Sequence, residues 1–219
     1  MDLFDIVGPI MVGPSSSHTA GAVRIGYVAS RLLDEPVQKA TILLHGSFFA
    51  TGEGHGTRKA IVAGLLGMAP DDYQIANSFE IAQEQGTEIE FGEIELEDAH
   101  PNTAVLRLKG ISSKEIEIQA SSVGGGRINI DKIDGINTNF SGDNPTLIVH
   151  NLDQPGHVAE VTSMLAHKSV NIATMQLFRS DKGQNAVMVL ECDQPIPEDG
   201  IPWLAHVEGV LRVTYFPGC

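Results

Sequence analysis

Two loops of this sequence gather side chains that bind anions or transfer protons. The first, Gly13-Pro-Ser-Ser-Ser-His-Thr19, holds four hydroxyl groups in five positions just before a predicted helix. A helix N-cap needs one hydroxyl, so Ser15, Ser16, Ser17 and Thr19 leave donors to spare at the positive end of the helix dipole. Two interpretations stay open: a plain N-cap, or a site for a small anion such as a carboxylate.

The second loop presents a histidine among glycines. It runs from His45-Gly-Ser47 to Thr51-Gly-Glu-Gly-His-Gly-Thr57, between a predicted strand and a predicted helix. Glycine neighbours offer no side chains to pack against His55, so the pattern favours an exposed, functional imidazole over a structural one. An unperturbed imidazole has a pKa of about 6.5 and suits proton transfer near neutral pH. His18 of the first loop is the second candidate.

Two further segments are interpreted as walls of the same site. Ala99-His-Pro-Asn-Thr103 presents an imidazole, an amide and a hydroxyl, and Ser121-Ser-Val-Gly-Gly-Gly-Arg127 is a glycine run that suits a backbone anion nest. Each segment alone is also typical of a turn. The sequence contains no Cys-x-x-Cys, His-x-x-x-His or G-x-S-x-G pattern, so it lacks a familiar metal cage or hydrolase elbow.

The elements that must position these loops form a mixed α/β region. Small and apolar residues recur at helical spacing from Thr19 to about Leu33, and a second helix follows over 57–66, with a buried strand over 40–45 between them. Alternating apolar and charged residues then predict half-buried, mostly antiparallel strands. These strands are expected at 88–91, 93–96, 104–108, 115–118 and 127–130.

The C-terminal segment has the pattern of a compact βαββαβ unit. Strands are predicted over 146–152, 170–178, 185–191 and 210–216, with helices from about 155 to 168 and over 198–206. The polar, turn-rich stretch 137–145 separates it from the first region, which gives domains 1–143 and 144–219. The fold class is therefore α+β: a mixed α/β domain with antiparallel strands, then a ferredoxin-like unit.

Composition excludes several classes of protein. The chain has 219 residues, 14 basic and 28 acidic, for a net charge of −14. This balance argues against nucleic acid as a partner, because nucleic-acid binding needs a basic surface. No apolar run approaches the length of a membrane span, and the first residues lack the basic region of a signal peptide. Two cysteines do not make a disulfide framework, so we expect a cytoplasmic protein.

The C-terminal unit resembles an ACT domain, a small regulatory module that commonly binds amino acids at dimer interfaces. The similarity lies in Asp153-x-Pro155-Gly156 after the first strand and in Val170-Asn171-Ile172 at the second. It implies a homodimer formed through this domain. It also implies a set of ligand or interface residues: Asn151, Asp153, Gly156, His157 and Asn171.

The loops together resemble the β component of bacterial iron–sulfur L-serine dehydratase. The pair Ser-Ser-Ser-His-Thr19 and Thr-Gly-x-Gly-His-Gly-Thr57, in this order, is the most specific part, and the resemblance covers essentially the whole chain. It implies deamination of L-serine to pyruvate and ammonia, with a 4Fe-4S cluster on a partner α subunit. A cluster needs cysteine ligands, and Cys192 and Cys219 are too few and wrongly placed, so we expect no metal in this chain and no activity without the α subunit.

The resemblance also suggests roles for the loop residues. His55 is the expected base and His18 the second proton-transfer or orienting group. The expected substrate-binding residues are Ser15, Ser16, Ser17, Thr19, Ser47, Thr57 and Asn102. One alternative is a non-catalytic amino-acid-binding regulatory subunit or sensor, and a weaker one is a metal hydratase built from His18, His45, His55 and His100.

Overall fold

The computed structural model describes residues 10–179, 183–197 and 199–218. By internal contacts the chain forms two compact units, Met1–Gly135 and Ile136–Cys219. The sequence places the boundary at 143/144, and residues 136–143 are the segment on which the two divisions differ. Among the described residues, no helix combines the length and apolar character needed to cross a membrane.

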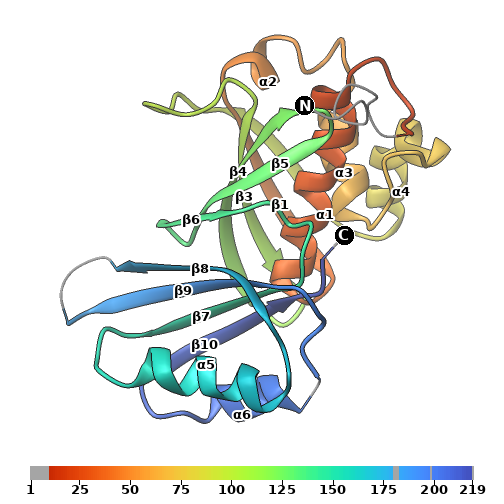
Figure 1. Ribbon diagram of the computed structural model, residues 1–219. Helices are drawn as coiled ribbons and strands as arrows, with labels where there is room; N and C mark the ends of the chain where they lie inside the picture. Colours follow the sequence, from red (N-terminus) through yellow and green to blue (C-terminus); the bar gives the residue numbers. More distant parts are fainter. Residues whose placement is uncertain (1–9, 180–182, 198, 219) are drawn as a thin grey trace. The chain divides into compact units, whose positions relative to one another are not determined.

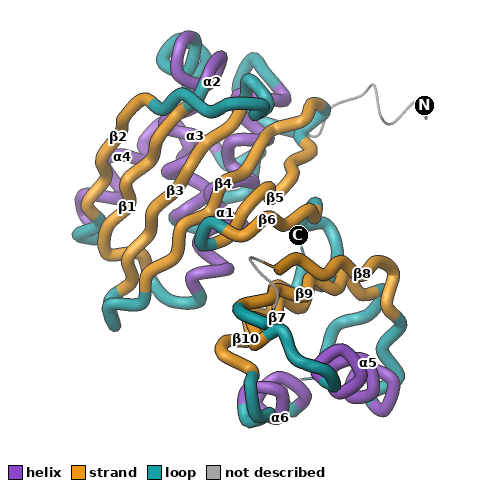
Figure 2. Tube along the Cα trace, turned by 90° about the vertical axis from the view of Figure 1, so that its left-hand side faces the viewer, coloured by secondary structure: helices purple, strands orange, loops and turns teal. Residues whose placement is uncertain are grey.

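Helices of the first unit cover one face of its sheet (Figure 2). A π-helical turn, Ser16–Gly21, leads directly into α1. The helices are α1 (Ala22–Leu33), α2 (Gly46–Ala50), α3 (Thr57–Leu65), a 3-10 turn (Tyr73–Asn77) and α4 (Ser78–Glu84). The strands are β1 (Val37–Leu44), β2 (Glu88–Glu93), β3 (Thr103–Gly110), β4 (Glu115–Gly124) and β5 (Arg127–Ile133).

These strands pair in the order β2-β1-β3-β4-β5. All the pairs are antiparallel except β1 with β2, which is parallel. The expectation of mostly antiparallel strands is therefore confirmed, with one exception that follows from the helical connection between β1 and β2. The predicted separate strand over 93–96 is wrong: β2 runs through to Glu93, and beyond it Ile94 donates one backbone hydrogen bond to Leu44.

The helix predicted over 19–33 begins earlier, because the π-helical turn extends the helical path back to Ser16. The helix predicted at 57 starts there, after Gly56 in the left-handed region with φ of 72°. Glycine tolerates this conformation better than other residues, so the glycine loop and the helix start are one structural feature. The helices α2 and α4 were not predicted.

The second unit has a ferredoxin-like topology. After β6 (Ile136–Phe140), its elements are β7 (Thr146–Leu152), α5 (His157–His167), β8 (Ile172–Arg179), β9 (Asn185–Cys192), α6 (Gly200–Ala205) and β10 (Val210–Phe216). Strands β10-β7-β9-β8 form an antiparallel sheet in that order, and α5 and α6 lie on one side of it (Figure 1). The predicted βαββαβ order is confirmed. The turn predicted at Ser180–Gly183 lies mostly outside the described residues.

Candidate functional site

The serine loop and the glycine loop meet at two imidazole rings. The ring centroids of His18 and His55 lie 5.0 Å apart, tilted by 45°. The Thr19 hydroxyl also donates to the carbonyl oxygen of His55, at 3.5 Å. Residues that are 37 positions apart in the sequence therefore form one site.

His18 is held on both sides by hydroxyl groups. Its Nδ1 lies 3.4 Å from the Ser15 hydroxyl, and its Nε2 lies 3.2 Å from the Ser47 hydroxyl and 3.1 Å from that of Thr51. The edge of Phe48 packs against the ring, with centroids 5.3 Å apart. Burial, and then the neighbouring His55, lower the pKa of His18, against a smaller opposing effect of a hydrogen bond with the backbone of Ser47. His18 is therefore neutral at neutral pH.

His55 is exposed, and its tautomer follows from one contact. Its Nδ1 lies 3.2 Å from the backbone carbonyl oxygen of Thr51. A carbonyl oxygen only accepts, so in the neutral ring Nδ1 carries the proton and Nε2 carries the free lone pair. An exposed imidazole with an unprotonated Nε2 can take a proton from a ligand.

Ser15 has the role of the helix cap. Its hydroxyl accepts a hydrogen bond from the backbone N–H of His18 at 3.1 Å, and its carbonyl accepts one from Thr19. The hydroxyls of Ser16 and Ser17 are half-buried and make no hydrogen bond to any described residue. The plain cap and the anion site are therefore compatible: Ser15 serves the first, and two hydroxyls remain for the second.

The other predicted walls lie close by in the fold but differ in what they offer. The Ser47 backbone N–H donates to Pro101, and Ser122 donates its N–H to the carbonyl of Asn102, which ties the 45–57, 99–103 and 121–126 loops together. Thr57 is fully buried, and its hydroxyl has no partner among the described residues. The side chain of Asn102 makes no hydrogen bond to either imidazole within the described structure.

His45 and His100 point to backbone groups rather than to the His18–His55 pair. His45 Nδ1 lies 3.3 Å from both the carbonyl of Ile94 and the N–H of Leu96, and His100 Nδ1 accepts from the N–H of Asn102. Within the part of the chain that the structure describes, no three His, Cys, Asp or Glu side chains converge as metal ligands.

Sequence reasoning did not single out Thr51 or Phe48. Thr51 was only part of a glycine motif, although it follows Ser47 by four residues and precedes His55 by four. On a helical turn, residues four apart share a face, so this spacing was the available signal. Phe48 carried no such signal, since its contact with His18 depends on tertiary packing.

The predicted residues of the second unit separate into two groups. Asn151 and His157 are buried, and among the described residues Asn151 Oδ1 and both ring nitrogens of His157 have no hydrogen-bond partner. The Asp153 carboxylate accepts from the backbone N–H of Gly183 at 2.9 Å, and Gly156 has φ of 110° at the start of α5. Asn171 instead lies at the opposite end of the sheet, where its amide donates to Asp193 at 2.6 Å.

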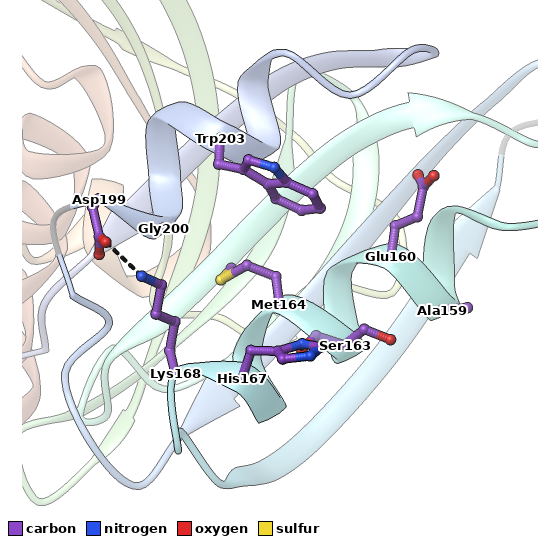
Figure 3. Close-up of a pocket in the computed structure, with 9 residues that line it drawn as sticks. All are labelled: Ala159, Glu160, Ser163, Met164, His167, Lys168, Asp199, Gly200 and Trp203. Carbon is purple, nitrogen blue, oxygen red and sulfur yellow. Dashed lines mark hydrogen bonds and ion pairs between the residues drawn. The ribbon is translucent and has the colours of Figure 1, made fainter.

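A groove of about 650 Å³ lies between α5 and α6 in the same unit (Figure 3). Met164 and the half-exposed Trp203 line it, and an ion pair between Lys168 and Asp199 borders it. None of the residues that line this groove is a predicted site residue.

Comparisons with known proteins point to one family. The family described as serine dehydratase beta chain matches residues 1–88. Over 212 residues the chain is 39% identical to a probable L-serine dehydratase beta chain of Bacillus subtilis (strain 168), covering 97% of this chain and 96% of that protein. Over 213 residues it is 37% identical to the L-serine dehydratase beta chain of Peptoniphilus asaccharolyticus, with the same coverage.

A weaker similarity joins the chain to a larger enzyme. D-3-phosphoglycerate dehydrogenase of Bacillus subtilis (strain 168) is 26% identical over 193 residues, which cover 88% of this chain but 36% of that enzyme. The two beta chains, in contrast, match almost from end to end.

Proposed function

Since the chain belongs to the family of L-serine dehydratase β chains, we propose that it is one subunit of a two-chain lyase that converts L-serine to pyruvate and ammonia. This subunit provides the site for the substrate carboxylate and the acid/base groups, and an α subunit provides the rest of the active site. The observation that carries the proposal is the free Nε2 lone pair of His55 beside a hydroxyl-rich helix start.

The proposed carboxylate site uses the start of the π-helical turn. The first N–H groups of a helix have no acceptor within the helix, and the dipole favours an anion there. The hydroxyls of Ser16 and Ser17 add donors that no described residue occupies. Removal of the α-proton places further negative charge on the substrate carboxylate, so donors fixed in advance stabilise the transition state more than the ground state.

The proposed base is His55. Its Nε2 takes the proton from Cα of serine, the Cα–H electron pair forms the Cα–Cβ double bond, and the Cβ–O bond breaks. The departing hydroxyl group and the proton taken from Cα together make up the water that is released. The aminoacrylate product then takes up water and releases ammonia, which leaves pyruvate. His18 is neutral, with each ring nitrogen beside a hydroxyl, so its role is to orient groups rather than to remove the proton.

The implied 4Fe-4S cluster does not fit the described cysteine of this chain. Cluster ligands are thiolates, whereas Cys192 is buried in the core of the second unit and burial raises the pKa of its thiol to about 11. Cys219 lies outside the described residues. We therefore assign the cluster to the α subunit.

The alternative is a regulatory subunit that binds an amino acid without catalysis. The specific observation in its favour is the similar stretch within D-3-phosphoglycerate dehydrogenases, which are named for a different activity. A sensor needs the carboxylate site but has no use for an unprotonated imidazole, so His55 separates the two hypotheses.

The test is an anaerobic assay of pyruvate formation from L-serine with this chain, with its cognate α chain, and with both. We expect activity only in the mixture. The control is a mixture containing the His206→Gln variant, which alters an exposed histidine just after α6 and should be as active as the unmodified mixture. Activity of either chain alone would refute the two-chain site. An inactive mixture that still binds L-serine would favour the sensor.

A further inference from the structure

Thr51 contacts both imidazoles of the site through different atoms. Its hydroxyl oxygen lies 3.1 Å from Nε2 of His18, and its backbone carbonyl oxygen lies 3.2 Å from Nδ1 of His55. The same hydroxyl donates to the backbone carbonyl of Ser47 at 2.9 Å. One residue at the end of α2 therefore joins the two histidines.

The Thr51 hydroxyl has two possible acceptors for its single proton, and their distances favour one of them. A threonine hydroxyl has one proton to donate, and the carbonyl oxygen of Ser47, which only accepts, lies 2.9 Å away, closer than Nε2 of His18 at 3.1 Å, so the proton is assigned to that carbonyl. Toward His18 the Thr51 oxygen is then an acceptor, so the Nε2 of His18 must be the donor. The remaining nitrogen of the neutral ring, Nδ1, is unprotonated and accepts from the Ser15 hydroxyl at 3.4 Å.

The Ser47 hydroxyl cannot fix this tautomer by itself. It lies 3.2 Å from the same Nε2, and no carbonyl among the described residues takes its proton. A hydroxyl that is free to rotate serves equally as donor or acceptor. The Ser47 hydroxyl can therefore form a hydrogen bond with Nε2 of His18 whether or not that nitrogen is protonated. The Thr51 hydroxyl differs from the Ser47 hydroxyl because its proton is already used in a hydrogen bond to a carbonyl oxygen.

We infer that Thr51 is a positioning residue that sets opposite tautomers on the two imidazoles, Nε2–H on His18 and Nδ1–H on His55. The catalytic consequence rests on the proposed function: the arrangement leaves Nε2 of His55 as the one ring nitrogen of the pair with an unused lone pair, and it keeps His18 as a donor at Nε2. The side chain of Thr51 acts on His18, whereas its backbone carbonyl acts on His55.

The direct test is the tautomer of each ring in the full chain, without partner or turnover. Long-range ¹H–¹⁵N correlation spectra of ¹⁵N-histidine-labelled protein separate protonated from unprotonated ring nitrogens, and His18→Gln and His55→Gln variants assign the signals. We expect a protonated Nε2 on His18 and a protonated Nδ1 on His55. A protonated Nδ1 on His18 in the unmodified chain would overturn the inference.

Two substitutions isolate the hydroxyl. Thr51→Val keeps the shape but removes the hydrogen bonds, so His18 should shift to a mixture of tautomers while His55 keeps its own. Thr51→Ser keeps the hydroxyl and should leave both rings unchanged. An unaltered His18 spectrum in Thr51→Val would overturn the inference, and because the wild-type spectrum is itself a test, poor folding of one variant does not remove it.

The catalytic consequence is measured separately in the two-chain enzyme. Thr51→Val should lower kcat by about 10- to 100-fold, the range reached when the hydrogen-bond partner of a functional histidine is lost, and Thr51→Ser should restore most of it. A full kcat in Thr51→Val despite an altered His18 tautomer would refute the catalytic role. A confirmed tautomer pair in a mixture without serine turnover would instead refute the proposed function and leave the tautomer assignment standing.

Discussion

At the scale of single residues, the two histidines of the site have different surroundings although their rings are neighbours. His18 is half-buried against Phe48 and flanked by three hydroxyls, whereas His55 is exposed and fixed by a single backbone carbonyl. Burial disfavours the charged form of an imidazole, so the pair separates a neutral, oriented ring from a ring open to a ligand. This difference supports distinct roles for them.

Replacing the proposed base should abolish turnover but spare binding. In His55→Gln we expect kcat for pyruvate formation in the two-chain enzyme to fall by roughly 10²- to 10⁴-fold, the usual contribution of a general base. The carboxylate site does not include His55, so the dissociation constant for L-serine should change little, as measured by calorimetry. Unchanged turnover would rule out His55 as the base.

The lowered pKa of His18 predicts how stability depends on pH. The folded chain protonates His18 less readily than the unfolded chain, so protonation favours unfolding. His18 costs no stability above its unfolded pKa of about 6.5, and stability is lost as the pH falls from there toward the folded pKa. The urea midpoint should therefore drop less between about pH 7 and pH 5 in His18→Gln than in the unmodified chain.

The variant His206→Gln serves as the control for this series, because it removes an exposed histidine of the second unit. Its pH dependence should follow that of the unmodified chain. If the urea midpoint falls equally with pH in His18→Gln and in the unmodified chain, the lowered pKa of His18 is contradicted.

At the scale of elements, Gly26 and Gly64 allow α1 and α3 to pack closely; these are the helices that follow the His18 loop and the His55 loop. A Cβ atom added to Gly64 of α3 would lie 1.9 Å from the carbonyl oxygen of Val23, and one added to Gly26 of α1 would lie 2.1 Å from that of Ile61. Because α1 follows the His18 loop and α3 follows the His55 loop, this crossing sets the spacing of the two imidazoles.

Substituting one of these glycines should destabilise the fold. Alanine has a higher helix propensity than glycine by about 1 kcal/mol, but in Gly64→Ala the new methyl group must displace backbone. We expect a net loss of about 1–3 kcal/mol in the free energy of unfolding, typical of overpacking, measured by urea titration. Gly54→Ala is the control, since its nearest contact would be an ordinary 3.8 Å, and a neutral Gly64→Ala would contradict the close packing.

At the scale of the whole molecule, the predicted ligand or interface residues of the ACT-like unit lie toward opposite ends of its sheet. Asp153 follows β7 near the start of β9, whereas Asn171 precedes β8 near the end of β9. A strand of eight residues spans about 26 Å at about 3.3 Å per residue, so one small ligand does not contact both residues in one chain. A shared site would form only between protomers.

We therefore expect a homodimer through this unit. Met175 and Leu177 lie on one face of β8, the end strand of the sheet, with 37% and 50% of their surface exposed. Replacing both by glutamate should convert the dimer to a monomer in sedimentation velocity runs at micromolar concentration. Ile111→Glu, which alters an exposed residue of the first unit, should stay dimeric, and a monomeric unmodified chain would contradict the prediction.

The sequence by itself indicated most of the helices and strands, and it indicated which loop residues are able to bind an anion or transfer a proton. Local patterns sufficed for β7 and β10, whose predicted and observed bounds agree, and for the start of α3 after Gly56. Apolar and charged residues alternate along a strand that has one buried and one exposed face. This alternation can be read from neighbouring residues in the sequence. The separate strand at 93–96 failed because alternation continues past Glu93, where the ladder ends.

Only the tertiary structure decided which groups meet and in what protonation state. The contact of His18 with His55, the edge of Phe48 and the role of Thr51 depend on how α1 crosses α3, and that crossing is a property of long-range packing rather than of local spacing. The acceptor proposed for His18 lies 33 residues further along the chain, at Thr51, whereas the carbonyl that faces His55 lies only four residues before it. A sequence motif therefore indicates which groups can react, but the fold decides whether the lone pair of an imidazole nitrogen lies where a substrate can reach it.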